Sequence, residues 1–122
     1  MNELRTLVQR YLDSWRAKDL SSMAQCLHPD VHFVGPTLRT EGREAFLRAA
    51  GGMFPLLVDH VVREMIIERD RAVAIYDFYC RPPIGCCRTA ELIGFADGSI
   101  RSVEVFFDAQ PFATPPSGSV AA

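Results

Sequence analysis

Apolar and polar residues alternate from Thr89 to Asp108, and this alternation predicts two β-strands joined by a tight turn. The turn is expected within Ala96–Ser99, because an Asp-Gly pair between apolar runs favours a two-residue hairpin. Alternate side chains of a strand point to the same face. One face of the first strand therefore carries Thr89, Glu91, Ile93 and Phe95, and one face of the second carries Val103, Val105 and Phe107. The carboxyl of Glu91 thus stands in a mainly apolar column, either on a solvated edge or in a pocket.

The start of the chain has the spacing of an amphipathic helix. Its apolar residues recur three and four positions apart and form one stripe: Leu4, Leu7, Val8, Tyr11, Leu12 and Trp15. Asp19 predicts the N-cap of a short second helix, which we expect to end at Pro29. A third helix is predicted over Gly42–Gly52, where a Gly-Gly pair is typical of a helix end.

The remaining pattern predicts strands. We expect a short edge strand over Val31–Val34, a polar loop over 37–42, and strands over 58–69, 72–81 and 86–96 before the last hairpin strand. Three helices followed by a four-stranded meander predict an α+β fold, in which a curved, mainly antiparallel sheet wraps around three N-terminal helices. Such a cone encloses an internal pocket on its concave side.

Composition limits the classes of function. The chain has 122 residues, 48% of them hydrophobic, and a net charge of −2, as expected for one globular domain. We place that domain at 1–113 and predict a flexible, Pro- and Ser-rich tail over 114–122. The lack of a basic run argues against a nucleic acid partner, and no apolar stretch is long enough to span a membrane. The N-terminus lacks the apolar core of a signal peptide, so we expect a cytoplasmic protein.

The metal-binding residue types show no metal-site spacing. The histidines His28, His32 and His60 are not spaced as ligands with one another or with a cysteine. We therefore predict no metal. The cysteines are expected to be free thiols, because the cytoplasm is reducing. They are Cys26, Cys80, Cys86 and Cys87.

Three segments together carry a resemblance to a known family. They are VQRYLDSWRAKDLSSMAQCLHPDVHFVGP, a glycine followed by a helix, and a final hairpin with DGSI. These segments resemble the SnoaL-like and ketosteroid-isomerase-like proteins of the nuclear-transport-factor-like fold, over roughly residues 4 to 108. The resemblance implies the cone-shaped fold. It leaves the activity open, because this fold hosts isomerases, dehydratases, cyclases and plain binding modules.

The resemblance also implies candidate catalytic residues. In the steroid isomerases a helix tyrosine and a protonated acid hold the enolate oxygen, and these positions resemble Tyr11 and Glu91. The aspartate base of those enzymes falls on Gly35, so the usual base is absent. Asp77 is predicted as the replacement base, because the family's pocket column resembles the face of strand 72–81 that carries it. The other residues expected to line the pocket are Trp15, Phe33, Phe46, Phe54, Ile75, Tyr79, Thr89, Ile93, Val103, Val105 and Phe107.

This assignment places the other face of strand 72–81 on the convex side of the sheet. The apolar patch expected there consists of Ala74, Tyr76, Phe78, Cys80, Leu92 and Phe106. A patch of this size is larger than a monomer usually exposes, and it predicts a homodimer through the convex face.

Each candidate also has a purely structural interpretation. Asp77 could pair with Arg88 or Arg63 of neighbouring strands, Glu91 could pair with an arginine across the sheet, and Tyr11 could be an ordinary core tyrosine.

The sequence therefore predicts a pocket for a small hydrophobic molecule. As an enzyme without a cofactor, the protein would isomerise, dehydrate or cyclise a carbonyl compound. Tyr11 and Glu91 would bind the carbonyl oxygen and Asp77 would move a proton. The alternative is a non-catalytic module of the same fold, which binds a ligand or a protein partner.

Overall fold

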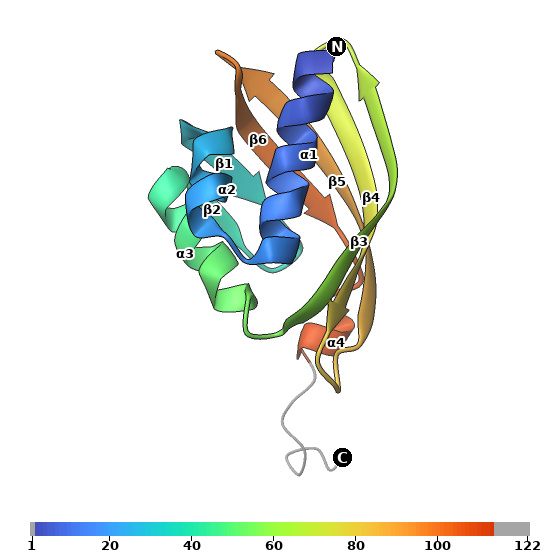
Figure 1. Cartoon of the computed structure of the whole chain (residues 1–122). Helices are drawn as coiled ribbons and strands as arrows, with labels where there is room; N and C mark the ends of the chain where they lie inside the picture. The colour runs from blue at the N-terminus through green and yellow to red at the C-terminus, as the bar shows by residue number, and fades with distance from the viewer. Residues whose placement is uncertain (1, 114–122) are drawn as a thin grey trace.

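The computed structural model describes residues 2–113, in which helices pack on one side of a strongly curved sheet (Figure 1). The helices are α1 (Asn2–Ala17), α2 (Leu20–Cys26), α3 (Arg43–Met53) and α4 (Gln110–Ala113). The strands are β1 (Leu27–Val34), β2 (Arg39–Glu41), β3 (Leu57–Glu68), β4 (Arg71–Cys80), β5 (Cys86–Ala96) and β6 (Ser99–Phe106). Their order across the sheet is β2-β1-β6-β5-β4-β3. Only the β1–β6 pair of this described sheet is parallel, so the predicted α+β class is confirmed.

The predicted apolar stripe of α1 is the part of that helix which packs on the sheet. Val8, Tyr11 and Leu12 are each at most 1% exposed, and α1 lies along the concave side of the sheet in Figure 1. Each such apolar side chain stabilises the fold by roughly 1.5–3 kcal/mol on burial. The predicted N-cap of α2 is confirmed as well: the carboxylate of Asp19 accepts hydrogen bonds from the backbone nitrogen and hydroxyl of Ser22.

The predicted Asp-Gly turn is also confirmed. Asp97 and Gly98 have φ angles of 54° and 76°, the positive values that a type I′ hairpin turn requires at both central residues. This turn joins β5 to β6, whose paired residues include Glu91 with Val105.

The start of the sheet differs from the prediction. Strand β1 begins at Leu27, directly after α2, and Pro29 lies inside the strand instead of ending the helix. The ladder between β1 and β6 has an irregularity between Leu27 and His32, so Pro29 does not have to donate a hydrogen bond there. The predicted polar loop contains β2, which is the edge strand in place of β1.

The predicted orientation of β4 is wrong. Ala74 lies opposite Glu91 and Tyr76 lies opposite Thr89 in the β4–β5 ladder. Directly opposite residues of two antiparallel strands point to the same face, so the even-numbered side chains of β4 accompany Glu91 on the concave side. Ala74, Tyr76, Phe78 and Cys80 therefore face the helices, and Val73, Ile75, Asp77 and Tyr79 face outward.

The end of the described chain closes one end of the cone. The ring of Phe112 in α4 packs edge-on against Phe107, with 5.4 Å between the ring centroids. The flexible tail predicted over 114–122 lies outside the described residues. None of the helices in the described part of the chain is long and apolar enough to cross a membrane. The four cysteines are free thiols in this structure.

Candidate active site

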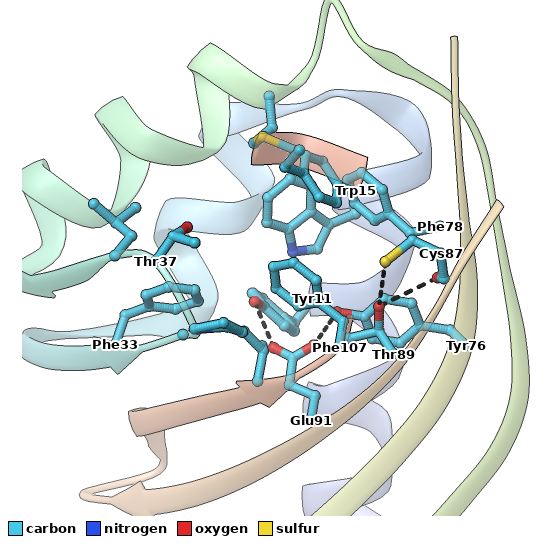
Figure 2. Close-up of a pocket in the computed structure, with 16 residues that line it drawn as sticks. Tyr11, Trp15, Phe33, Thr37, Tyr76, Phe78, Cys87, Thr89, Glu91 and Phe107 are labelled. Carbon is cyan, nitrogen blue, oxygen red and sulfur yellow. Dashed lines mark hydrogen bonds between the residues drawn. The ribbon is translucent and has the colours of Figure 1, made fainter. Parts of the chain in front are cut away.

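The concave side of the sheet holds an apolar cavity of about 160 Å³ between α1, β4, β5, β6 and the 35–38 loop (Figure 2). Its residues come from six parts of the chain that the fold brings together. They are Tyr11, Trp15, Phe33, Gly35, Pro36, Thr37, Leu38, Met53, Tyr76, Phe78, Cys87, Thr89, Glu91, Val105, Phe107 and Phe112. Glu91 is the one carboxylic acid among them, and its side chain is 1% exposed.

Two tyrosine hydroxyls hold the carboxyl of Glu91. The hydroxyl of Tyr11 donates to Oε2 over 2.9 Å, and the hydroxyl of Tyr76 donates to Oε1 over 2.8 Å (Figure 2). Glu91 has room on the face of β5 because the residue opposite it on β4 is the small Ala74. The three groups come from α1, β4 and β5, so only the tertiary fold brings them together.

Burial raises the pKa of the Glu91 carboxyl to near neutral pH. Loss of solvent raises its pKa from the ordinary 4.5 to about 7, and the hydrogen bonds from Tyr76 and Tyr11 act in the opposite direction. The same burial, with the adjacent carboxylate, raises the pKa values of Tyr11 and Tyr76 well above 10.0, so both stay protonated. A carboxyl with a pKa near the ambient pH can both accept and return a proton.

A buried histidine, His60, packs against one of these two tyrosines. The ring of His60 stacks on the ring of Tyr76 with 4.3 Å between centroids, and it is 2% exposed. Burial lowers the pKa of His60 to about 4, so the imidazole is neutral near pH 7. His60 does not line the cavity; it packs Tyr76 into position.

A smaller recess of about 60 Å³ adjoins the cavity. The two share Trp15, Phe33, Leu38 and Met53, and the recess is completed by Thr40, Phe46, Ala49 and Ala50. Trp15 packs edge-on against Phe78 and Phe54, at centroid distances of 5.7 and 5.6 Å. Three buried side-chain atoms in the described part of the chain lack a hydrogen-bond partner: Trp15 Nε1, Thr40 Oγ1 and His60 Nε2.

Asp77 lies outside the cavity, which corrects its predicted position. It points to the convex side, is 3% exposed, and accepts hydrogen bonds from Arg63 Nε at 2.8 Å and from Arg88. The hydrogen bond from Arg88, followed by that from Arg63, lowers the pKa of Asp77 to about 2. The alternative interpretation, an ion pair with these arginines, is therefore correct. A carboxylate that stays ionised on the far face of the sheet cannot serve as the base of this cavity.

The other predicted wall residues divide into three groups. Trp15, Phe33, Thr89, Val105 and Phe107 line the cavity. Phe46 lines the recess, Phe54 packs behind Trp15, and Ile93 and Val103 are buried in the core. Ile75 and Tyr79 lie on the convex side with Asp77, and the Tyr79 hydroxyl accepts a hydrogen bond from Arg63. The last two positions are corrections with the same cause, the reversed orientation of β4.

The sequence prediction missed the polar residues Tyr76 and Thr37 of the site and part of its apolar wall. Tyr76 could have been found from the strand pairing: it lies two residues after Ala74, which is opposite Glu91, so both side chains share the face of Glu91. Gly35, on which the aspartate base of the steroid isomerases falls in the sequence resemblance, does line the cavity. A Cβ atom there would come within 3.1 Å of Val105 Cγ2, so the wall is already close-packed at this point.

The fold defines a class: α+β proteins in which helices pack on the concave side of a curved, mainly antiparallel sheet. An NTF2-like protein of unknown function from Cytophaga hutchinsonii is 24% identical, with coverage of 90% of this chain and 94% of that chain and a TM-score of 0.81. A protein from Kribbella flavida that is provisionally assigned as a ketosteroid isomerase is 20% identical, with coverage of 97% and 85% and a TM-score of 0.81. TerC, co-crystallised with polyporic acid, is 18% identical, with coverage of 91% and 95% and a TM-score of 0.78.

The sequence narrows this class to one family. The profile of the SnoaL-like domain matches residues 8–105, so the chain belongs to the SnoaL-like domain family. No curated protein shows a significant match to it. At these identities the solved structures establish the shared fold and nothing more specific.

Proposed function

We propose that this protein is a cofactor-independent enzyme that moves a proton within a small, apolar carbonyl compound, with Glu91 as the proton carrier. The observation that carries the proposal is the carboxyl of Glu91 at the wall of an apolar cavity, held by two tyrosines, with a pKa of about 7. Perturbed titratable groups in clefts are typical of active sites. Glu91 takes the role that the sequence had assigned to Asp77.

The proton transfer balances without a further reactant. The carboxylate of Glu91 removes a proton from the carbon next to the ligand's carbonyl group, and the C–H electron pair forms the double bond of an enolate. Protonated Glu91 then returns the proton to a different carbon, which isomerises the ligand. Each oxygen of Glu91 accepts one tyrosine hydrogen bond and retains lone-pair capacity for this step. Enolate formation also begins dehydrations and aldol-type cyclisations.

The size of the cavity favours a small ligand. A cavity of about 160 Å³ is close to the roughly 150 Å³ of an engineered apolar cavity that binds benzene. One ring therefore fits inside, and a larger ligand would extend into the recess that Thr40 lines or past Phe112. One structural neighbour, provisionally assigned as a ketosteroid isomerase, is consistent with proton transfer in a carbonyl compound.

One observation favours the alternative, a non-catalytic binding module. Gly35 leaves the family's usual base position without a side chain. In that case the cavity binds the same class of ligand, and Glu91 only orients it.

The test is the isomerisation of cyclohex-3-en-1-one to its conjugated isomer, followed by ultraviolet absorbance. We expect turnover by the wild type and its loss in Glu91→Gln, which cannot carry the proton. Glu44→Gln, the same exchange at an exposed position of α3, is the matched control and should retain turnover. Binding of the ketone with no turnover would support the binding module, and equal rates in Glu91→Gln and wild type would remove Glu91 from the mechanism.

We also propose that the convex face forms a homodimer, through a patch that differs from the predicted one. Four of the predicted residues face the helices: Ala74, Tyr76, Phe78 and Cys80. The outward-facing apolar residues are Ile66, Val73, Ile75, Leu92 and Phe106, of which Ile66 and Phe106 are each 53% exposed.

Light scattering tests this assembly. Phe106→Lys should convert a dimer to a monomer, and Leu20→Lys, on the helical side of the molecule, is the control that should remain a dimer. A monomeric wild type at tens of micromolar, on the scale of ordinary dimer affinities, would contradict the proposal.

A further inference from the structure

The polar groups near Glu91 are already engaged with one another. The hydroxyls of Tyr11 and Tyr76 both donate to Glu91. The hydroxyl of Thr89 donates to the backbone oxygen of Cys87 over 3.3 Å. While Glu91 is ionised, neither tyrosine can donate to a ligand without giving up the carboxylate. A ligand oxygen in the cavity therefore needs a different hydrogen-bond donor.

Trp15 offers such a donor. Its Nε1 atom is buried and makes no hydrogen bond of normal geometry, and an indole nitrogen can only donate. Figure 2 shows this nitrogen on the edge of the ring that faces Tyr11 and Glu91. The N–H is directed toward the hydroxyl of Tyr11 as a weak donor, and this interaction lowers the pKa of Tyr11, against the larger effect of burial. Buried polar groups without a partner are rare, and each one calls for an explanation such as a ligand.

The other two unpaired atoms do not serve this cavity. Thr40 Oγ1 belongs to a residue that lines only the adjoining recess, and His60 Nε2 belongs to a residue that lines neither space. Among the described residues that line the cavity, Trp15 is thus the one with a buried donor that makes no hydrogen bond of normal geometry.

From this geometry we infer that the indole N–H of Trp15 binds the ligand's carbonyl oxygen, which makes Trp15 a further catalytic residue and the ligand an uncharged cyclic ketone. The inference rests on the proposed function. When Glu91 removes the proton, the electron pair of the C=O double bond moves to oxygen, and Trp15 donates to the negative charge that forms there. An anionic ligand is disfavoured, because the carboxylate of Glu91 would repel it in the same apolar cavity.

Nuclear magnetic resonance tests the contact directly, because the chain has 1 tryptophan and so gives a single indole N–H signal. The ¹⁵N-labelled protein is titrated with cyclohexanone and, separately, with methylenecyclohexane, which has the same shape but carries =CH2 in place of the oxygen. We expect a downfield shift of the indole proton with the ketone and not with the hydrocarbon. Equal shifts with both, or no shift at saturating ketone, would overturn the inference.

A variant that removes only the N–H separates this role from packing. Trp15 is replaced by 3-benzothienylalanine, in which sulfur takes the place of the nitrogen in a ring of nearly the same shape, and by phenylalanine as a second variant. Cyclohexanone should bind about three- to tenfold more weakly to the benzothienyl protein, the effect of one neutral hydrogen bond, whereas methylenecyclohexane should bind as before. Equal weakening for both ligands would mean that Trp15 only packs, and unchanged ketone binding would refute the contact.

The two proposals can fail separately. A ketone-specific indole shift without isomerisation of cyclohex-3-en-1-one would support the Trp15 contact and refute the proposed enzyme. Isomerisation that requires Glu91 but leaves the indole signal unmoved would support the enzyme and refute the contact. If both hold, loss of the N–H should lower kcat by about 10²- to 10³-fold, as for one donor to an oxyanion.

Discussion

The burial of Glu91 predicts that the stability of the protein falls as the pH rises. Its pKa is about 7 in the folded protein, against an ordinary value of 4.5 for an exposed glutamate. Between these two pH values the folded protein keeps a proton that the unfolded chain has released, so the free energy of unfolding decreases with pH and levels off above about 7. At about 1.4 kcal/mol for each pKa unit, the decrease amounts to about 3.5 kcal/mol.

Glu91→Gln removes this dependence on pH. The amide has nearly the same shape and does not titrate, and it can accept from one tyrosine and donate to the other. Relative to the wild type, the variant should therefore gain about 3.5 kcal/mol of stability from about pH 4.5 to about pH 8. This is a large part of the roughly 5–15 kcal/mol that holds an ordinary domain together, so the difference is easily measured.

Urea unfolding of both proteins at a series of pH values, and at one protein concentration, measures the difference. The concentration is held constant because a dimer would be more stable at higher concentration. Glu44→Gln controls for the exchange of a carboxyl for an amide at an exposed position outside the proposed dimer face. A stability difference between wild type and Glu91→Gln that does not change with pH would refute the reasoning, since the carboxyl would then titrate alike in the folded and unfolded states.

Three further predictions concern the site and its surroundings. The kcat/KM for cyclohex-3-en-1-one should rise with pH through about 7, because the base is the ionised form of Glu91, and a flat pH–rate profile would contradict this. Tyr76→Phe should move the midpoint of that profile to higher pH, because the hydrogen bond from Tyr76 lowers the pKa of Glu91; an unmoved midpoint would mean that this bond is unimportant. Asp77→Asn should leave turnover unchanged and lower the melting temperature near pH 7, because Arg63 and Arg88 lose their partner. Since Asp77 has a lowered pKa of about 2, that loss of stability should shrink as the pH falls toward this value, and a loss of turnover would instead restore Asp77 as a catalytic candidate.

Local patterns in the sequence predicted much of this fold because their causes are local. The turn at Asp97-Gly98 depends on the φ angles of two residues, and the stripe that includes Tyr11 depends on the helical repeat. The N-cap at Asp19 likewise involves a residue only three positions away. The short strand β2 was missed because its three residues have no periodicity of their own; it forms by pairing with β1.

The orientation of β4 could not be read from that strand alone. Both of its faces are largely apolar, and its one carboxylate, Asp77, stood out as a residue that ought to be functional. The pairing of β4 with β5 contains the missing information. In this hairpin the numbers of paired residues have an odd sum, as in Ala74 with Glu91 or Asp77 with Arg88. Two odd-numbered residues, one on each strand, therefore cannot share a face.

This odd sum of the paired residue numbers links the two errors about the site. Once Glu91 is placed in the pocket, the pairing excludes Asp77 from it and admits Tyr76 in its place. Asp77 then lies beside Arg88, with which it forms an ion pair, and Glu91 accepts a second hydrogen bond, from the hydroxyl of Tyr76. The replacement changes the chemistry that can be proposed. The predicted site had two acids with separate tasks, whereas the cavity of the folded protein has one acid, and both of its oxygens accept hydrogen bonds from tyrosines. For this reason we infer that the ligand's oxygen takes its hydrogen bond from Trp15.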